Sequence, residues 1–186
     1  MNADIESMLR QIEANKSDGQ AIVSGLTDEQ LNWHPGERGG AWSILDCLEH
    51  LNVSVTKTLP AFDRSIAEGR ARGQASNGPF RYGWFARMVA ASMEPPPKWR
   101  MRAPRLVRVA PASNRRSADV VPEFMRVRDR LAERMRQADG LDLAHVRLIS
   151  PVNRLLRVPL GTYFNFILAH DRRHLWQARN VRKGLA

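Results

Sequence analysis

Hydrophobic side chains recur every three or four residues along four long stretches of the chain, which is the spacing of a helix with one buried face. In the second stretch, Leu45, Leu48, Val55 and Leu59 share such a face. No segment alternates polar and apolar residues over the length of a strand. The pattern predicts an all-α protein, a four-helix bundle with long crossover connections. The four stretches are residues 3–25, 41–68, 118–138 and 159–182.

The segments between these stretches predict shorter elements and two connections. Thr27 and Gln30 have the spacing of a capping box, which begins a short helix, and residues 80–89 suggest another helix. Residues 95–116 contain five prolines and seven basic residues, so a regular helix is excluded there. We expect an ordered crossover in this segment, and residues 141–158 form the second connection. The apolar side chains that can pack the crossover on the bundle are Trp99, Met101, Leu106, Val107 and Val109.

Length and composition are those of one globular domain over residues 1–186, because 43% of the residues are hydrophobic and 26% are charged. The first residues are polar and show no signal peptide. No apolar run approaches the roughly 20 residues that span a bilayer. The single cysteine, Cys47, excludes a disulfide within the chain and a cysteine-rich zinc site. We therefore expect a cytoplasmic protein without a membrane partner.

The formal net charge is +10, from 29 Lys and Arg residues against 19 Asp and Glu residues. Such an excess attracts nucleic acid or anionic substrates, but it first describes a solvated surface. The basic run in residues 95–116 has no signature of a helix-turn-helix, a zinc finger or an RNA-binding motif. We therefore do not expect a nucleic-acid partner. A basic nucleic-acid-binding module is kept as an alternative, and the same run could bind an anionic substrate.

His170 and His174 lie four residues apart on the last predicted helix, one turn from each other on one face. They continue the stripe of Tyr163 and Ile167, so both face the bundle. Two imidazoles in this arrangement can bind one metal ion, and a third histidine would complete a set that leaves a coordination position open. The string HDRRH also resembles the zincin motif, but Asp171 stands where that motif has its catalytic glutamate, which argues against a protease.

His50, on the second predicted helix, is the candidate for the third ligand. Its helical phase places it opposite the hydrophobic seam. Either this helix has two contact faces, one of them toward a polar cleft, or His50 is a surface or hydrogen-bonded residue. His34 and His145 lie in predicted loops, where we expect surface residues. The residues that share a polar stripe with His50 are Ser43, Asp46, Cys47 and Ser54.

Three segments together resemble the DinB-like superfamily: LTDEQLNWHP, AWSILDCLEHLN and HDRRHLWQARNV. This group includes proteins described as metal-dependent hydrolases and is related to thiol-dependent S-transferases. The resemblance implies a DinB-like four-helix bundle with a crossover topology. It places the metal ligands on His50, His170 and His174, and it implies zinc or nickel as the divalent metal ion. It also implies a homodimer.

A three-histidine site suggests two kinds of chemistry. Neutral imidazoles leave the metal its full charge, which lowers the pKa of a water molecule toward about 7, or the metal holds a low-molecular-weight thiol as its thiolate. The acid or base candidates are Asp46, Asp171 and Tyr163. Asp46 could instead orient His50, Tyr163 could be an aromatic core residue, and we expect Cys47 to be buried filler.

The sequence therefore predicts a metal-dependent enzyme that acts on a small-molecule substrate. Its two forms are a hydrolase and a small-thiol-dependent transferase. The alternative is a bundle that binds a metal without catalysis.

Overall fold

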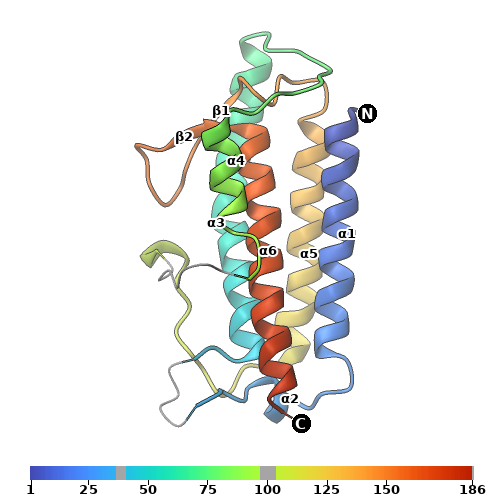
Figure 1. Ribbon diagram of the computed structural model, residues 1–186, viewed down its shortest axis with the longest axis vertical. Coiled ribbons are helices and arrows are strands. Elements are labelled where there is room, and N and C mark those ends of the chain that lie inside the picture. Colours follow the sequence, from blue (N-terminus) through green and yellow to red (C-terminus); the bar gives the residue numbers. More distant parts are fainter. Residues whose placement is uncertain (37–40, 97–103, 186) are drawn as a thin grey trace.

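The computed structural model describes residues 1–36, 41–96 and 104–185. Its long helices are α1 (Ala3–Val23), α3 (Ile44–Ala71), α5 (Ser117–Gln137) and α6 (Leu160–Lys183). Its shorter elements are α2 (Asp28–Leu31), α4 (Trp84–Ala91), the 3-10 helix η1 (Arg105–Val107), β1 (Arg147–Ile149) and β2 (Arg157–Pro159). The all-α bundle predicted from the sequence is confirmed, with the four long helices close to their predicted bounds (Figure 1). Within the three described ranges, no helix has the length and apolar character needed to cross a membrane.

Each long helix packs against two others, because α1 and α3 both contact α5 and α6 (Figure 1). The Asn2 backbone N–H donates to the Asp139 carboxylate at 2.8 Å, and Ala75 forms a β-bridge with Leu141. The start of α1 therefore lies at the end of the bundle where α3 and α5 finish and α6 begins. Because α3 and α5 run in the same direction, residues 72–116 must travel the length of the bundle between them. This crossover carries α4 and η1.

Reciprocal side-chain caps fix where α2 and α3 begin. Thr27 and Gln30 form the predicted capping box, with hydrogen bonds of 3.0 and 3.3 Å. Ser43 and Asp46 form a second box, with hydrogen bonds of 3.1 and 3.2 Å, so α3 begins directly after Ser43 and not at residue 41 as predicted. A capping box satisfies backbone N–H groups that the first turn of a helix leaves unpaired. The second box thus sets the register of the helix that carries the third candidate ligand.

The crossover packs on the bundle through part of its predicted apolar set. Val107 and Val109 are buried as predicted. Leu106 is 45% exposed, so its predicted packing is wrong. It lies in the short η1 turn, where neighbouring side chains point in different directions, and Val107 takes the buried position. Trp99 and Met101 lie outside the described residues.

The connection between α5 and α6 contains a small antiparallel hairpin that the sequence pattern did not predict. β1 pairs with β2, with Leu148 opposite Val158, and both of these side chains are buried. Strands of three residues are too short to show an alternating pattern. The hairpin closes the end of the bundle at which α6 begins, since the Leu160 N–H donates to the Val146 carbonyl at 2.9 Å.

An ion pair between Arg128 and Asp171 is completely buried inside the core. Arg128 of α5 donates to both carboxylate oxygens of Asp171 on α6, at 2.9 and 3.1 Å, and both side chains are 0% exposed. The guanidinium also donates to Asn52 at 3.1 Å and lies 3.8 Å above the Phe124 ring. Burial raises the pKa of Asp171, and the charge of Arg128 opposes that rise. Apolar side chains of the same core include Ile5, Ile12, Phe62, Leu131 and Phe164.

Asp171→Asn should lower the free energy of unfolding by about 3–5 kcal/mol, because it leaves the buried Arg128 charge uncompensated. The matched control is Asp129→Asn. Asp129 pairs with Lys16 at 2.6 Å, but its side chain is 61% exposed, and exposed pairs contribute about 0–1 kcal/mol. Urea denaturation of the two variants measures the difference. Equal losses would contradict the structural role assigned to Asp171.

Candidate metal centre

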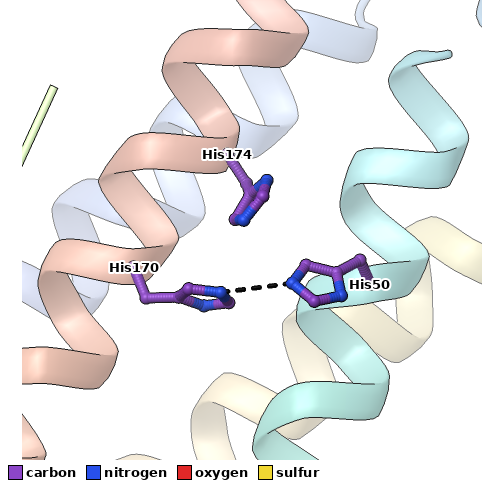
Figure 2. A group of neighbouring side chains, drawn as sticks. All are labelled: His50, His170 and His174. Carbon is purple, nitrogen blue, oxygen red and sulfur yellow. Dashed lines mark hydrogen bonds between the residues drawn. The ribbon is translucent and has the colours of Figure 1, made fainter. Parts of the chain in front are cut away.

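Three histidines from two helices meet on one side of the bundle (Figure 2). His50 comes from α3, and His170 and His174 come from α6. One nitrogen of each ring can be chosen so that all three atoms lie within 4.8 Å of one another, and His50 Nε2 is 3.2 Å from His170 Nε2. The ring centroids are 4.6 to 5.0 Å apart. The structure therefore brings together the three residues that the resemblance implies as ligands.

His50 is buried although its helical phase places it opposite the hydrophobic seam of α3. Its side chain is only 1% exposed. One face of α3 packs on α5 and α6, and η1 of the crossover covers another face. Of the two interpretations left open by the sequence, the structure supports the helix with two contact faces.

Hydrogen bonds at two of the rings determine which nitrogen faces the centre. His50 Nδ1 lies 2.8 Å from the Val107 carbonyl oxygen, which can only accept, so this nitrogen carries the proton. His174 Nδ1 lies 3.1 Å from Gln177 Oε1 and donates in the same way. In both rings the Nε2 lone pair remains available for a metal. The third ring differs, because His170 Nδ1 is buried and has no hydrogen-bond partner among the described residues.

The environment keeps the three imidazoles neutral. Burial lowers the pKa of His170 well below its usual value, and the neighbouring His174 and His50 lower it further. Burial, followed by the charge of His50, lowers the pKa of His174 to about 3. Burial also lowers the pKa of His50, although the hydrogen bond to Val107 opposes this shift. Neutral imidazole is the form that binds a metal, so the site is in its ligating form at neutral pH.

The donor set fits a divalent transition metal. Imidazole nitrogens suit zinc, nickel, copper and iron. With Zn–N bonds near 2.0–2.1 Å, two nitrogens of a tetrahedral site lie about 3.4 Å apart, close to the 3.2 Å between His50 Nε2 and His170 Nε2. His170 and His174 are only partly buried, so the cluster reaches the surface on the α6 side. Three protein ligands leave at least one position for another molecule, as catalytic metal sites require.

Two aromatic side chains border the histidines. The Trp42 ring lies 4.8 Å from the His50 ring and 5.6 Å from the His174 ring, measured between centroids. Phe166 stacks on His170 at 6.2 Å with an angle of 14° between the planes. These rings cover parts of the imidazoles from water and restrict their rotation.

Asp46 is fully buried and occupied by contacts outside the cluster. Besides capping α3, its carboxylate lies 2.8 Å from His34 Nε2 and accepts from Arg115 Nε at 2.9 Å and from the Ala112 N–H at 3.2 Å. The alternative prediction, that Asp46 orients His50, is wrong, because His50 Nδ1 donates to the Val107 carbonyl and not to Asp46. The prediction that His34 is a surface residue is wrong, because its side chain is only 16% exposed.

The other two acid or base candidates also have partners in the core. Asp171 holds Arg128, as described above. Tyr163 is 6% exposed and belongs to the main hydrophobic cluster, and its hydroxyl is hydrogen-bonded to Ser150 and Thr58. Within the described ranges, the metal-ligand cluster consists of the three histidines and includes neither a carboxylate nor a thiol.

The remaining predictions near the site can be placed as well. Cys47 is 0% exposed within the core, as expected of filler, and burial raises the pKa of its thiol. His145 is 74% exposed, as expected of a surface residue. Sequence reasoning missed Val107 and Gln177 as partners of the ligands. Only Gln177 had a local signal, because it follows His174 by three residues on the same helix face.

The fold and the site define an α-helical bundle with a candidate three-histidine metal centre. The chain belongs to the DinB superfamily, because the family model of that description matches residues 11–178. The match covers all three histidines and most of every long helix, although it begins after the first eight residues of α1. No curated protein and no solved structure matches the chain.

Replacing one ligand should abolish tight metal binding. We expect His174→Ala to weaken binding of Zn²⁺ or Ni²⁺ more than about 100-fold, because even the loss of a partner behind a ligand costs about 10–100-fold. His145→Ala is the matched control, since that histidine is exposed and lies outside the cluster. Isothermal titration of chelator-treated protein gives both affinities. Equal affinities of the two variants would show that the metal binds elsewhere.

Chelated protein should lose stability in mild acid. The pKa of His174 is about 3 in the fold but about 6.5 in an unfolded chain. Between these values the unfolded state binds more protons, so stability rises with pH and falls as the pH drops below about 6.5. One such histidine contributes a slope of up to about 1.4 kcal/mol per pH unit. Urea denaturation between about pH 7 and pH 5 should show a shallower slope for His174→Gln, and an unchanged slope would contradict this assignment.

Proposed function

We propose that the protein is a metal-dependent enzyme that acts on small molecules, with a zinc or nickel ion held by His50, His170 and His174. The observation that carries the proposal is the convergence of three neutral imidazoles at a point that reaches the surface. Membership of the DinB superfamily supports it. A closed structural site would have four protein ligands, whereas the cluster within the described ranges has three.

The residues of the chain prepare the site for a Lewis acid. When bound, a divalent ion lowers the pKa of the water or thiol that occupies its remaining position. The three imidazoles are neutral, so they leave the charge of the ion undiminished. The Val107 carbonyl and Gln177 hold two of the rings in the ligating orientation. Trp42 shields His50 and His174 from bulk water.

Of the two chemistries, the surroundings favour thiol transfer over hydrolysis. In hydrolases of the zincin type a carboxylate acts as general base for the activated water, and here Asp46 and Asp171 are occupied elsewhere. A thiolate needs no further base once it is ionised. The Arg173 guanidinium lies near enough to lower the pKa of both His170 and His174, after larger effects that include burial and the neighbouring histidines. A guanidinium at this place attracts an anionic thiolate.

The reaction would join a small thiol to an electrophilic carbon. The thiol releases its proton to solvent, the thiolate sulfur forms a bond to the carbon, and the leaving group departs with the bonding electrons. Cys47 is not the nucleophile, because it is fully buried and burial raises the pKa of its thiol. The thiol must therefore come from outside the chain.

A homodimer also remains a prediction, which size-exclusion chromatography with light scattering would test.

Metal-loaded protein should consume a thiol in the presence of an electrophile. With L-cysteine and 1-chloro-2,4-dinitrobenzene as probes, we expect turnover above the uncatalysed rate that is lost on chelation and in His174→Ala. His145→Ala should keep the activity of the parent. Absorbance of the thioether product measures the rate.

Two other outcomes separate the alternatives. Hydrolysis of 4-nitrophenyl acetate without added thiol, together with no thioether formation, would contradict the transferase and favour a hydrolase. Tight stoichiometric metal binding without turnover on either probe would favour a bundle that binds a metal without catalysis.

A further inference from the structure

A second cavity lies between α1, α4 and α6. Its volume is about 360 Å³, at the lower end of the range of about 300–1,000 Å³ for small-molecule sites. From α6 it is lined by Thr162, Asn165 and Arg172, which share one side of that helix. His170 and His174 lie on another side, and no residue of the cavity belongs to the histidine cluster. The cavity is therefore distinct from the metal centre.

Two hydroxyl groups of this cavity have no hydrogen-bond partner. Tyr82 Oη and Thr162 Oγ1 are buried and unsatisfied within the described part of the chain. Thr162 is 3% exposed, so water does not freely replace the missing partner. Buried hydroxyls are nearly always paired, because an unpaired one carries the full cost of its desolvation. A ligand that hydrogen-bonds to both groups would remove this cost.

Gly161 provides the space that Tyr82 occupies. A Cβ atom at Gly161 would overlap the hydroxyl of Tyr82. The tyrosine ring therefore approaches the backbone of α6 beside Thr162, and both residues line the same cavity, with their hydroxyl oxygens buried beside it. Because Gly161 has no side chain, the unpaired hydroxyls of Tyr82 and Thr162 are found at the same cavity.

The charges of the cavity are unevenly distributed. Arg172 donates to both carboxylate oxygens of Glu94, at 2.9 and 2.5 Å, and to Gln11 at 2.8 Å. This arginine and this glutamate neutralise each other. Arg87 also lines the cavity and is exposed, and no ion pair of its guanidinium occurs within the described residues. One positive charge is left for a ligand.

The hydroxyl side of the cavity disfavours an anion. Burial raises the pKa of Tyr82, and the negative charges of Asp4 and Asp142 raise it further, so the phenol stays neutral. The same two charges repel a ligand carboxylate from this side. An anionic group is therefore favoured beside Arg87, and a neutral polar group beside the two hydroxyls.

We propose that this cavity binds a small organic carboxylate. Its carboxylate pairs with Arg87, and its neutral polar group exchanges hydrogen bonds with Tyr82 and Thr162. The proposal is independent of the metal centre and of the reaction proposed there.

4-Hydroxybenzoate is a suitable probe, because it carries a carboxylate and a hydroxyl at opposite ends. Binding to the full chain is followed by NMR through the backbone amides of residues 161–165. Tyr82→Phe, Thr162→Val and Arg87→Gln should each weaken binding about ten-fold, the effect of losing one hydrogen bond or ion pair to a ligand. 4-Hydroxybenzamide, which lacks the charge, should bind about ten-fold more weakly to the parent.

A matched threonine separates ligand binding from stability. Thr58 is also buried, at 2% exposure, but its hydroxyl donates to the Ser54 carbonyl at 2.8 Å. Thr58→Val should lower the melting temperature and leave binding unchanged, whereas Thr162→Val should weaken binding without lowering the melting temperature. His174→Ala should bind the probe like the parent.

Three results would overturn the proposal. The first is no binding of 4-hydroxybenzoate at millimolar concentration, and the second is equal affinity for the acid and its amide. The third is parental affinity in both hydroxyl variants. Spectral changes at the three histidines in place of residues 161–165 would assign the binding to the metal centre and would likewise exclude this site.

Discussion

The buried carboxylate of Asp46 is the contact on which the metal centre depends. One of its oxygens accepts from the Ser43 N–H at the start of α3, and the other accepts from Arg115 in the crossover. A single group therefore fixes the first turn of α3 and the segment that covers that helix. His50 lies one turn after Asp46 on α3, and the crossover segment that Asp46 holds also supplies the Val107 carbonyl that orients His50. A fully buried carboxylate needs such partners, so the anchoring of the crossover and the orientation of the ligand are set together.

Buried polar atoms without partners mark both candidate sites. Four such side-chain atoms occur among the described residues. His170 Nδ1 lies in the metal centre, and the hydroxyls of Tyr82 and Thr162 lie in the second cavity. The fourth, Glu123 Oε2, is the oxygen that pairs with the Arg126 guanidinium, so it is not an unpaired group. Each unpaired group costs about 1–3 kcal/mol. A fold that keeps three of them at two sites has polar groups in place for molecules that the chain itself does not provide.

The hydrophobic repeat of the sequence predicts the helices but not the contacts between distant segments. A repeat of 3.6 residues locates helices that bury one face, and the bounds of α1, α5 and α6 follow from it. The same repeat could not place His50, because α3 buries one face against helices and another under the crossover. Only the family resemblance joined His50 to His170 and His174. The hairpin, the Val107 carbonyl and the second cavity depend on contacts between distant segments, which no local pattern encodes.

Three consecutive residues of α6 explain why the string HDRRH misleads when it is compared with a protease motif. Successive residues of a helix point about 100° apart, so His170 faces the metal centre, Asp171 the core and Arg172 the second cavity. Asp171 holds Arg128 through two hydrogen bonds inside the core. This pair resists rotation of α6 about its axis, and that rotation would move His170 out of the cluster. Asp171 therefore anchors α6, and it affects the chemistry by holding its neighbour His170 in position.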